Sequence, residues 1–342
     1  MRTIVLDQPR QLSVVDRPVP RAPGPGEALV RVHRIGICGT DLHAYQGNQP
    51  FFTYPRVLGH ELGVEVVEVD DVAGGAEGIR AGDRCAVEPY LSCGACIACR
   101  AGKTNCCVRL QVLGVHADGG MRELITVPVR ALHRSGTLSL DQLALVEPLC
   151  VGAHAVARAG VEAGECVLVI GAGPIGLSVV QFASLAGAKV LVMDVNRDRL
   201  AFAREHFQIE AAIEAGDAGI DRVEGLTDGD MPALVFDATG NQRSMTAAFD
   251  LPAHGGRLVF VGLFQGDVTF HDPAAHRREL TLLCSRNALA ADFKRVISLL
   301  ESGRVATSHW ISHRVPFGDG VLGGFPRWLD PQSRFIKAVI DV

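Results

Sequence analysis

Several features are absent from this 342-residue chain, and each absence narrows the possibilities. Positive charge is not in excess, since the formal net charge is −5, so the broad basic surface that nucleic-acid binding requires is not expected. Internal repeats and low-complexity tracts are also absent. Aromatic residues are few, at 6%, whereas glycines are many, at 38. This length and composition predict two globular domains of α/β type with many tight turns.

A secretory segment is not recognisable at the start of the chain. The ten cysteines are therefore expected to be reduced thiols in a cytoplasmic protein. One uncharged stretch, Cys166–Ala188, is long enough to span a membrane. Glycines and Pro174 interrupt it, which predicts a strand, a turn and a helix instead. No membrane span is expected.

The chain has two parts that differ in their pattern of apolar and turn-forming residues. Residues 1–150 contain short strand-like runs between Gly/Pro turns, which predicts a mostly β domain; the runs are Ala28–Ile35, Leu62–Val69 and Arg84–Val87. Residues 151–285 alternate apolar runs with helical stretches, which predicts a parallel sheet covered on both faces; the runs are Val167–Ile170, Lys189–Met193, Leu234–Asp237 and Leu258–Gly262. Residues 286–342 are expected to return to the first domain, with a helix over Ala291–Ser302 and a closing strand over Phe335–Ile340.

Four cysteines in residues 90–110 have the spacing C-x2-C-x2-C-x7-C; they are Cys93, Cys96, Cys99 and Cys107. Thiolates this close repel one another unless a cation such as Zn²⁺ gathers them. Disulfides are the alternative, but these are typical of small secreted domains. The pattern therefore predicts a structural zinc lobe. Cys106 is an alternative fourth ligand.

A G-x-G-x-x-G motif directly follows the predicted strand Val167–Ile170 and begins a predicted helix, Pro174–Ala186. The first glycine allows a tight turn, the second lets a pyrophosphate approach the backbone, and the third allows the helix to pack closely on the strand. Amide groups at the helix N-terminus then face the phosphates. The motif predicts a dinucleotide site at Gly171, Gly173, Pro174, Ile175 and Gly176.

An acidic residue follows the next predicted strand. Asp194 stands at the separation expected of the acid that binds the adenosine ribose hydroxyls. Its carboxylate would repel a 2′-phosphate, which favours NAD over NADP. Arg197 and Arg199 nearby leave NADP open.

A second group of possible metal ligands is spread along the first domain. Cys38 begins a segment that also contains Thr40, Asp41 and His43; Gly59-His60-Glu61 follows, and Glu147 comes far downstream. Each residue alone is unremarkable. Together they offer sulfur, nitrogen and oxygen donors, a mixture typical of a catalytic zinc with an open position.

The order of these motifs resembles the zinc-dependent medium-chain alcohol/polyol dehydrogenases. The resemblance covers essentially the whole chain and depends on Cys38–Asp41, Gly59–Glu61, the four-cysteine lobe, Glu147-Pro148 and Gly171–Gly176. It implies a GroES-like catalytic domain, a doubly wound Rossmann domain and an active site in the cleft between them. It also implies NAD, two zinc ions per chain, and a homodimer or homotetramer.

Carried over residue by residue, the resemblance implies that Cys38, His60 and Glu147 bind the catalytic zinc. Glu61 matches an acid that enters or leaves the metal's coordination as substrate exchanges. Glu147 stands where liver-type alcohol dehydrogenases have cysteine, and Gly39 where they often have a basic residue, which places the chain on the polyol side.

The resemblance assigns further roles near the metal and the cofactor. Thr40 and His43 match a proton relay that runs through the cofactor ribose, and Asp41 matches the acid behind a zinc ligand. Arg199 and Leu263 match cofactor-binding positions.

Longer sequence strings resemble the bacterial L-galactonate/L-gulonate 5-dehydrogenases: 47–52, 104–107, 114–120 and 285–288. His116 and Arg286 lie in these strings and are predicted substrate residues, Arg286 as a possible partner of a carboxylate. A surface or interface arginine is an equal alternative.

Sorbitol or L-threonine are the alternative substrates. A zinc-ribbon nucleic-acid-binding module is the alternative from another class. The stretch Phe317–Phe325 departs from the family pattern.

Overall fold

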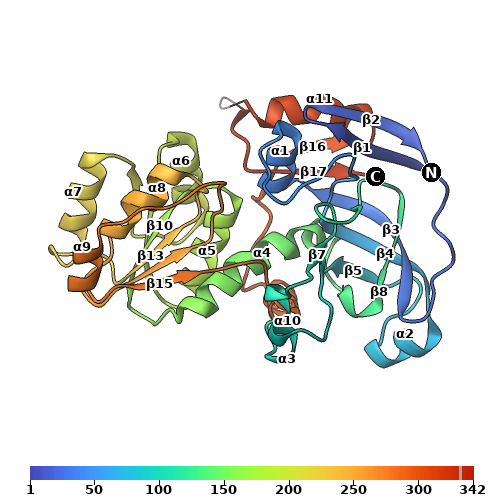
Figure 1. Ribbon diagram of the computed structural model, residues 1–342, viewed down its shortest axis with the longest axis horizontal. Coiled ribbons are helices and arrows are strands. Elements are labelled where there is room, and N and C mark those ends of the chain that lie inside the picture. Colours follow the sequence, from blue (N-terminus) through green and yellow to red (C-terminus); the bar gives the residue numbers. More distant parts are fainter. Residues whose placement is uncertain (331–332) are drawn as a thin grey trace. The chain divides into compact units, whose positions relative to one another are not determined.

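A computed structural model of the protein describes residues 1–330 and 333–342. The chain divides into two compact units, Met1–Pro148 with Ala288–Val342, and Leu149–Asn287 (Figure 1). Both boundaries lie two residues from the ones expected at 150 and 286. The first boundary falls within helix α4 (Leu140–Ala159).

The first unit is built on a seven-stranded sheet in the order β16-β17-β3-β4-β5-β9, with β8 paired to β3. The strands are β3 (Glu27–Gly36), β4 (Glu61–Val69), β5 (Arg84–Val87), β8 (Leu124–Pro128), β9 (Leu132–Arg134), β16 (Ile311–Pro316) and β17 (Lys337–Asp341). The strands predicted in β3, β4 and β5 are confirmed. The closing strand begins at Lys337 instead of Phe335, and it pairs antiparallel with β3, as Val339↔Gly36 shows.

Smaller elements surround this sheet. Two small antiparallel sheets are formed by β1 (Arg2–Gln8) with β2 (Gln11–Asp16) and by β6 (Tyr90–Leu91) with β7 (Gln111–Val112). The helices are α1 (Gly39–Gln46), α2 (Asp71–Glu77), α3 (Ile97–Arg100), α10 (Ala290–Glu301) and α11 (Asp319–Trp328). Helix α10 begins and ends one residue before the predicted helix.

Helix α11 was not predicted, because its sequence is rich in glycine. Val321, Phe325 and Trp328 are nevertheless buried, and the ring of Phe325 lies 5.1 Å from that of Tyr45 in α1. Burial of these apolar side chains outweighs the low helix propensity of the glycines. The atypical stretch Phe317–Phe325 is therefore part of the core.

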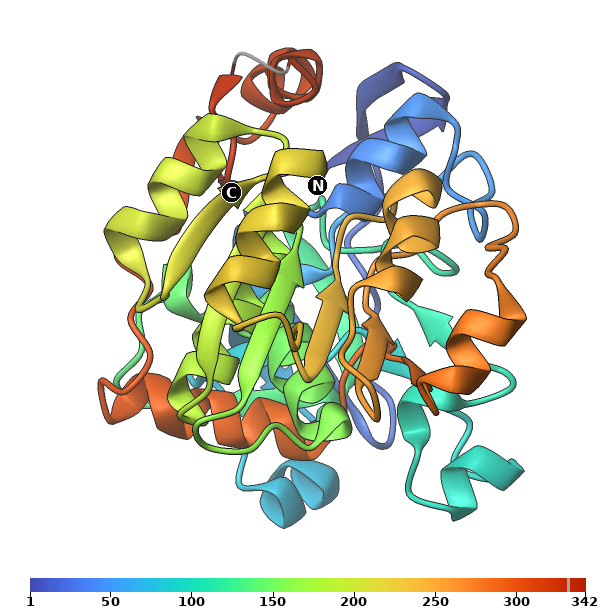
Figure 2. The same cartoon turned by 90° about the vertical axis from the view of Figure 1, so that its left-hand side faces the viewer.

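The second unit contains a six-stranded parallel sheet in the order β12-β11-β10-β13-β14-β15 (Figure 2). Its strands are β10 (Cys166–Ile170), β11 (Lys189–Asp194), β12 (Ala211–Glu214), β13 (Leu234–Asp237), β14 (Arg257–Phe260) and β15 (Thr281–Cys284). Its helices after α4 are α5 (Pro174–Leu185), α6 (Arg197–His206), α7 (Asp217–Leu226), α8 (Gln242–Ala247) and α9 (Asp272–Arg277). The chain enters the sheet at β10 and adds β11 and β12 on one side. It then returns to add β13, β14 and β15 on the other side of β10, which is the doubly wound arrangement predicted.

The four apolar runs predicted in this unit all lie in strands of the sheet. The last one ends at Phe260 instead of Gly262, because the amides of Val261 and Gly262 donate to the carbonyl oxygen of Asp237 and turn the chain.

One helix among the described residues, α4, is long and apolar enough to cross a membrane by length and composition alone. Of its most apolar 18-residue stretch, 67% is buried inside the protein, as in a core helix. Cys166–Ala188 folds as β10, a glycine turn and α5.

Candidate functional site

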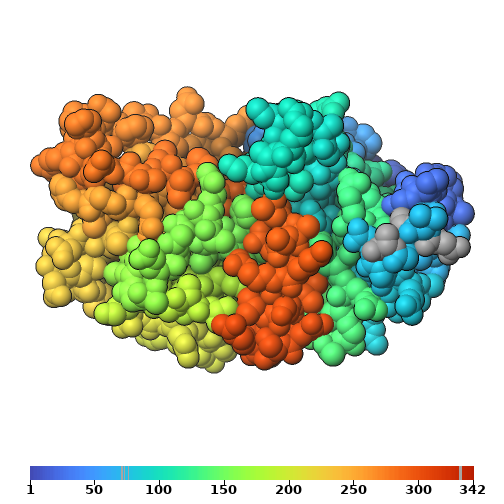
Figure 3. All heavy atoms as spheres, turned by 90° about the horizontal axis from the view of Figure 1, so that it is seen from below, coloured from blue at the N-terminus to red at the C-terminus, as the bar shows by residue number. Residues whose placement is uncertain are grey.

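Four cysteines meet in a lobe around α3. The Sγ atoms of Cys93, Cys96, Cys99 and Cys107 all lie within 4.8 Å of one another. The lobe lies at the surface, in teal in Figure 3. Cys106 is exposed and is not part of this group.

The lobe's backbone favours anionic sulfur. The amides of Cys93 and Arg109 donate to Cys107 Sγ at 3.3 and 3.4 Å. Hydrogen bonds from the backbone of Ala95 and from Arg109 lower the pKa of Cys93 to about 5. All ten cysteines are free, and four sulfur donors at this spacing fit a structural zinc ion.

A second possible metal site combines Cys38, His60 and Glu61, whose ligand atoms also lie within 4.8 Å of one another. Strand pairing explains why they meet, because Gly36 at the end of β3 is opposite Glu61 at the start of β4. A Cβ atom on Gly36 would lie 2.0 Å from Glu61 Oε2, so only glycine leaves room for this carboxylate.

Cys38 is the N-cap of α1. Its Sγ accepts a hydrogen bond from the Thr40 amide at 3.4 Å, and its own amide donates to Asp41 Oδ2 at 2.9 Å. This capping box fixes the thiol at the end of β3.

Asp41 lies behind His60. His60 Nδ1 is 3.7 Å from Asp41 Oδ1, and neither atom has a hydrogen-bond partner although both are buried. Burial opposes a positive charge here, but the negative charges of Asp41 and Cys38 raise the pKa of His60 well above its usual value. These surroundings therefore favour a cation. An imidazole held by a carboxylate on its other nitrogen is the usual arrangement of a metal-bound histidine, so these residues fit zinc.

Glu147, on α4, adds a further carboxylate. It is buried, and burial raises its pKa, although the charge of His60 opposes that shift. Glu147 is not part of the tight group of three. The hydroxyl of Tyr90 donates a hydrogen bond to Glu147 Oε1.

The structure adds a residue that the sequence did not single out. Lys337, on β17, is buried, and its Nζ lies 2.7 and 2.8 Å from the two oxygens of Glu61 and 3.0 Å from the carbonyl of Ile37. Burial alone would lower the pKa of Lys337, but the charge of Glu61 raises it. The sequence contained one signal for Lys337: it is a charged residue within the otherwise apolar strand predicted at Phe335–Ile340.

The predicted relay residues share one face of α1. Thr40 is half-buried, and His43, three residues later, is exposed. His43 Nδ1 lies 3.1 Å from Asn48 Oδ1. Because an amide oxygen accepts, Nδ1 is the donor in this contact.

Two of the sugar-acid-like strings meet next to this helix. The rings of Phe51 and His116 stack with centroids 6.3 Å apart. His116 Nδ1 accepts from the amide of Val112 at 3.2 Å. Arg286 lies in the other unit, directly after β15, and is exposed.

The glycine motif has the expected geometry. Gly171 has φ +97°, and a Cβ atom on Gly176 would lie 1.7 Å from the carbonyl oxygen of Gly171. Gly173 is the N-cap of α5, and Pro174 is in its first turn, before Ile175. Amides at the start of α5 thus remain for a ligand.

Asp194 ends β11 and is buried beside this loop. Its Oδ2 accepts from the Ala172 amide at 2.6 Å, and its Oδ1 from the Asn196 amide at 2.7 Å. The two bonds fix the carboxylate next to the glycine motif. The guanidinium of Arg199 lies 3.7 Å from where a Cβ of Gly173 would be, and Leu263 is 57% exposed at the same sheet edge.

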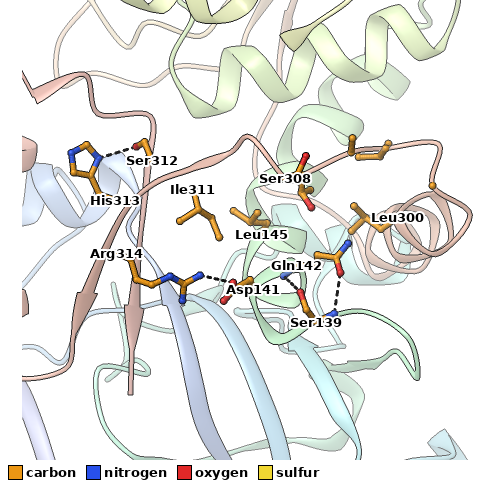
Figure 4. Close-up of a pocket in the computed structure, with 14 residues that line it drawn as sticks. Ser139, Asp141, Gln142, Leu145, Leu300, Ser308, Ile311, Ser312, His313 and Arg314 are labelled. Atoms are coloured by element: carbon orange, nitrogen blue, oxygen red, sulfur yellow. Dashed lines mark hydrogen bonds and ion pairs between the residues drawn. The ribbon is translucent and has the colours of Figure 1, made fainter. Parts of the chain in front are cut away.

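A pocket of about 640 Å³ lies in the first unit between the start of α4 and β16 (Figure 4). Asp141 and Arg314 form an ion pair at its wall, and Ser312 bonds to His313. None of the predicted site residues lines it.

Two family models match the chain. The alcohol dehydrogenase GroES-like domain matches residues 24–137, and the zinc-binding dehydrogenase domain matches residues 174–302. L-galactonate-5-dehydrogenase of Escherichia coli (strain K12) is 42% identical over 99% of this chain and 98% of its own length. 2-Dehydro-3-deoxy-L-galactonate 5-dehydrogenase of Pseudoalteromonas atlantica is 33% identical over 94% and 93%.

A solved structure gives the same result. The RspB alcohol dehydrogenase of E. coli CFT073 in complex with NADH has a TM-score of 0.91 and 32% sequence identity, and the match covers 100% of this chain and 99% of that one. The predicted fold and cofactors are thereby confirmed. The chain belongs to the zinc-type, medium-chain alcohol dehydrogenase family, and it is a zinc-containing, NAD-dependent dehydrogenase that acts on CH–OH groups.

Proposed function

We propose that this enzyme oxidises a secondary hydroxyl of a sugar acid, as an L-galactonate or L-gulonate 5-dehydrogenase does. The observation that carries the proposal is the contact between residues 47–52 and 114–120, the two strings that resemble sugar-acid enzymes. They meet at the Phe51–His116 ring stack, next to the helix that carries Thr40 and His43. The 42% identity to an L-galactonate dehydrogenase over nearly the whole chain supports the same substrate class.

The metal ligands in this proposal are Cys38, His60 and Glu147, with Glu61 as the exchangeable group. When bound, zinc supplies Lewis acidity that lowers the pKa of a hydroxyl group, as it lowers that of water to about 7, while NAD accepts the hydride. Asp41 orients His60, and Lys337 neutralises Glu61 in the dry interior.

Thr40 and His43 move the proton. The half-buried Thr40 hydroxyl accepts a hydrogen bond from the reacting hydroxyl and directs its proton outward. The exposed His43 has a protonated Nδ1, fixed by Asn48, so its Nε2 receives a proton and releases it to solvent.

The ten free cysteines support a reducing, cytoplasmic location. The family resemblance supports a homodimer or homotetramer that binds a small sugar acid or polyol.

Arg286 tests the substrate class. A hydrogen bond from arginine to a carboxylate contributes about 1.5–3 kcal/mol, so Arg286→Ala should lower kcat/KM for L-gulonate by about tenfold to a hundredfold. Sorbitol carries a hydroxymethyl group in place of that carboxylate and should lose much less. Arg277→Ala, an exposed arginine at the end of α9, is the matched control and should change neither value. Equal losses on L-gulonate and sorbitol would show that Arg286 does not hold a carboxylate.

A further inference from the structure

Cys38, His60, Glu61 and Glu147 are called the metal group here. One buried side chain close to this group has no part in the chemistry described so far. Tyr90, in β6, is 6% exposed, and its hydroxyl donates to Glu147 Oε1. Glu147 is itself buried, so the bond lies away from solvent. A tyrosine hydroxyl that points at a buried carboxylate takes one of its oxygens and leaves the other free.

The ring of Tyr90 is fixed from two sides. Strand pairing places Tyr90 opposite Val112 of β7. Phe293 of α10 contacts the ring edge-on, with centroids 6.3 Å apart and planes at 74°. The hydroxyl therefore has little freedom to leave Glu147.

Phe293 is in turn held by a second buried contact. His133 stacks on it at 4.7 Å, and His133 Nε2 lies 3.0 Å from Glu88 Oε2. Phe293 is completely buried. A series of packed side chains from β9 and α10 thus ends at the Tyr90 ring and holds it in place.

We infer that Tyr90 is a positioning residue for the catalytic metal: its hydroxyl fixes the Glu147 carboxylate with a single oxygen available as ligand and so slows loss of the metal. The inference rests on Glu147 being a zinc ligand, as in the proposed function. Groups that hydrogen-bond to a metal ligand typically change metal affinity or activity by about 10–100-fold when they are removed. Tyr90 touches neither substrate nor cofactor in this role, so metal retention is the property to measure.

Tyr90→Phe removes the hydroxyl and keeps the ring. The zinc-loaded protein is mixed with a coloured chelator, and the two zinc ions are followed as they are released. Tyr90→Phe should release the ion of the Cys38 group about 10–100-fold faster, while the four-cysteine lobe releases its ion at the wild-type rate. Tyr54→Phe is the matched control, because the Tyr54 hydroxyl donates to the backbone carbonyl of Ala44 and not to a metal ligand. It should release both ions as the wild type does.

Unchanged release from Tyr90→Phe would overturn the inference, because a purely structural tyrosine would leave metal retention alone. A wild type that binds zinc only in the four-cysteine lobe would instead contradict the proposed function.

A second measurement uses the wild-type sequence and does not depend on whether Tyr90→Phe folds. The chain has three tyrosines, so labelling with 3-fluorotyrosine gives three fluorine NMR signals, assigned with Tyr45→Phe and Tyr54→Phe. Removing and restoring the metal of the Cys38 group should shift the Tyr90 signal most. A Tyr90 signal that does not move would contradict the inference.

Discussion

At the scale of single residues, the metal group depends on balanced charge. The half-buried thiol of Cys38 lies with the buried carboxyl groups of Asp41, Glu61 and Glu147, and Lys337 from the last strand pairs with Glu61. Lys337 is 1% exposed on its side chain and Glu61 is 0% exposed. A pair this deeply buried has no water to replace a missing partner.

Lys337→Met should therefore destabilise the protein strongly. Removing one partner of a buried ion pair costs about 3–5 kcal/mol, which urea unfolding would show as a lower free energy of unfolding. The double variant Lys337→Met/Glu61→Gln should recover part of the loss, because no buried carboxylate is left unpaired. Lys294→Met, at an exposed position of α10, should stay within about 0.5 kcal/mol of the wild type. A loss no larger than that for Lys337→Met would refute this account of the pair.

We expect Asp194 to govern the choice of cofactor. Its carboxylate is fixed beside the glycine motif by the amides of Ala172 and Asn196, where a 2′-phosphate would meet its charge. The wild type should clearly prefer NAD, and Asp194→Ser should weaken that preference by raising kcat/KM with NADP relative to NAD. Glu210→Ser, at an exposed position just before strand β12 and so at the opposite end of the parallel strands, should leave the ratio unchanged. Equal use of NAD and NADP by the wild type would show the charge argument to be wrong.

Some residues of the candidate site could be predicted from the sequence, and others were found only in the structure. The meeting of the four lobe cysteines was predictable because their chemistry is specific and their spacing is short, whereas Cys38 and His60 were grouped by their donor atoms and by the family resemblance. Lys337 and Tyr90 were not, because each reaches the site through strand pairing or packing between segments far apart in sequence. Arg286 stays a prediction.

At the scale of elements, apolar runs predicted strands well where both faces of the strand are buried. The runs in β10, β11 and β13 are of this kind. Strand β15 was missed because it is largely exposed and lies at the edge of its sheet. Helix α11 was missed because its glycines concealed an apolar face that tertiary packing stabilises.

The cysteine lobe is the element whose fold we expect to depend on metal. Helix α3 has no buried residue, so the lobe has little apolar core of its own. Cys96→Ser should lower the soluble yield and the melting temperature, because it removes one of four zinc ligands. Cys106→Ser is the matched control, an exposed thiol next to Cys107 in the same lobe, and should behave as the wild type. Equal behaviour of the two variants would argue against a zinc-dependent lobe.

At the scale of the whole molecule, each unit carries one half of the predicted site. The mostly β unit carries the metal group and the relay helix, and the doubly wound unit carries the glycine motif and Asp194. The sequence predicted this division because the possible metal ligands lie in the part with a β pattern and the glycine motif lies in the part with an α/β pattern. Substrate identity depends instead on a few side chains, and it is the part of the account most open to experiment.

The central claim is that the substrate is a sugar acid, and NAD reduction tests it most directly. The purified, zinc-loaded enzyme is assayed with L-galactonate, L-gulonate, sorbitol and L-threonine at equal concentrations, with Cys38→Ser as the inactive control. We expect at least one of the two acids to give the highest kcat/KM and the control to give no turnover. Turnover of sorbitol or L-threonine without turnover of either acid would contradict the account.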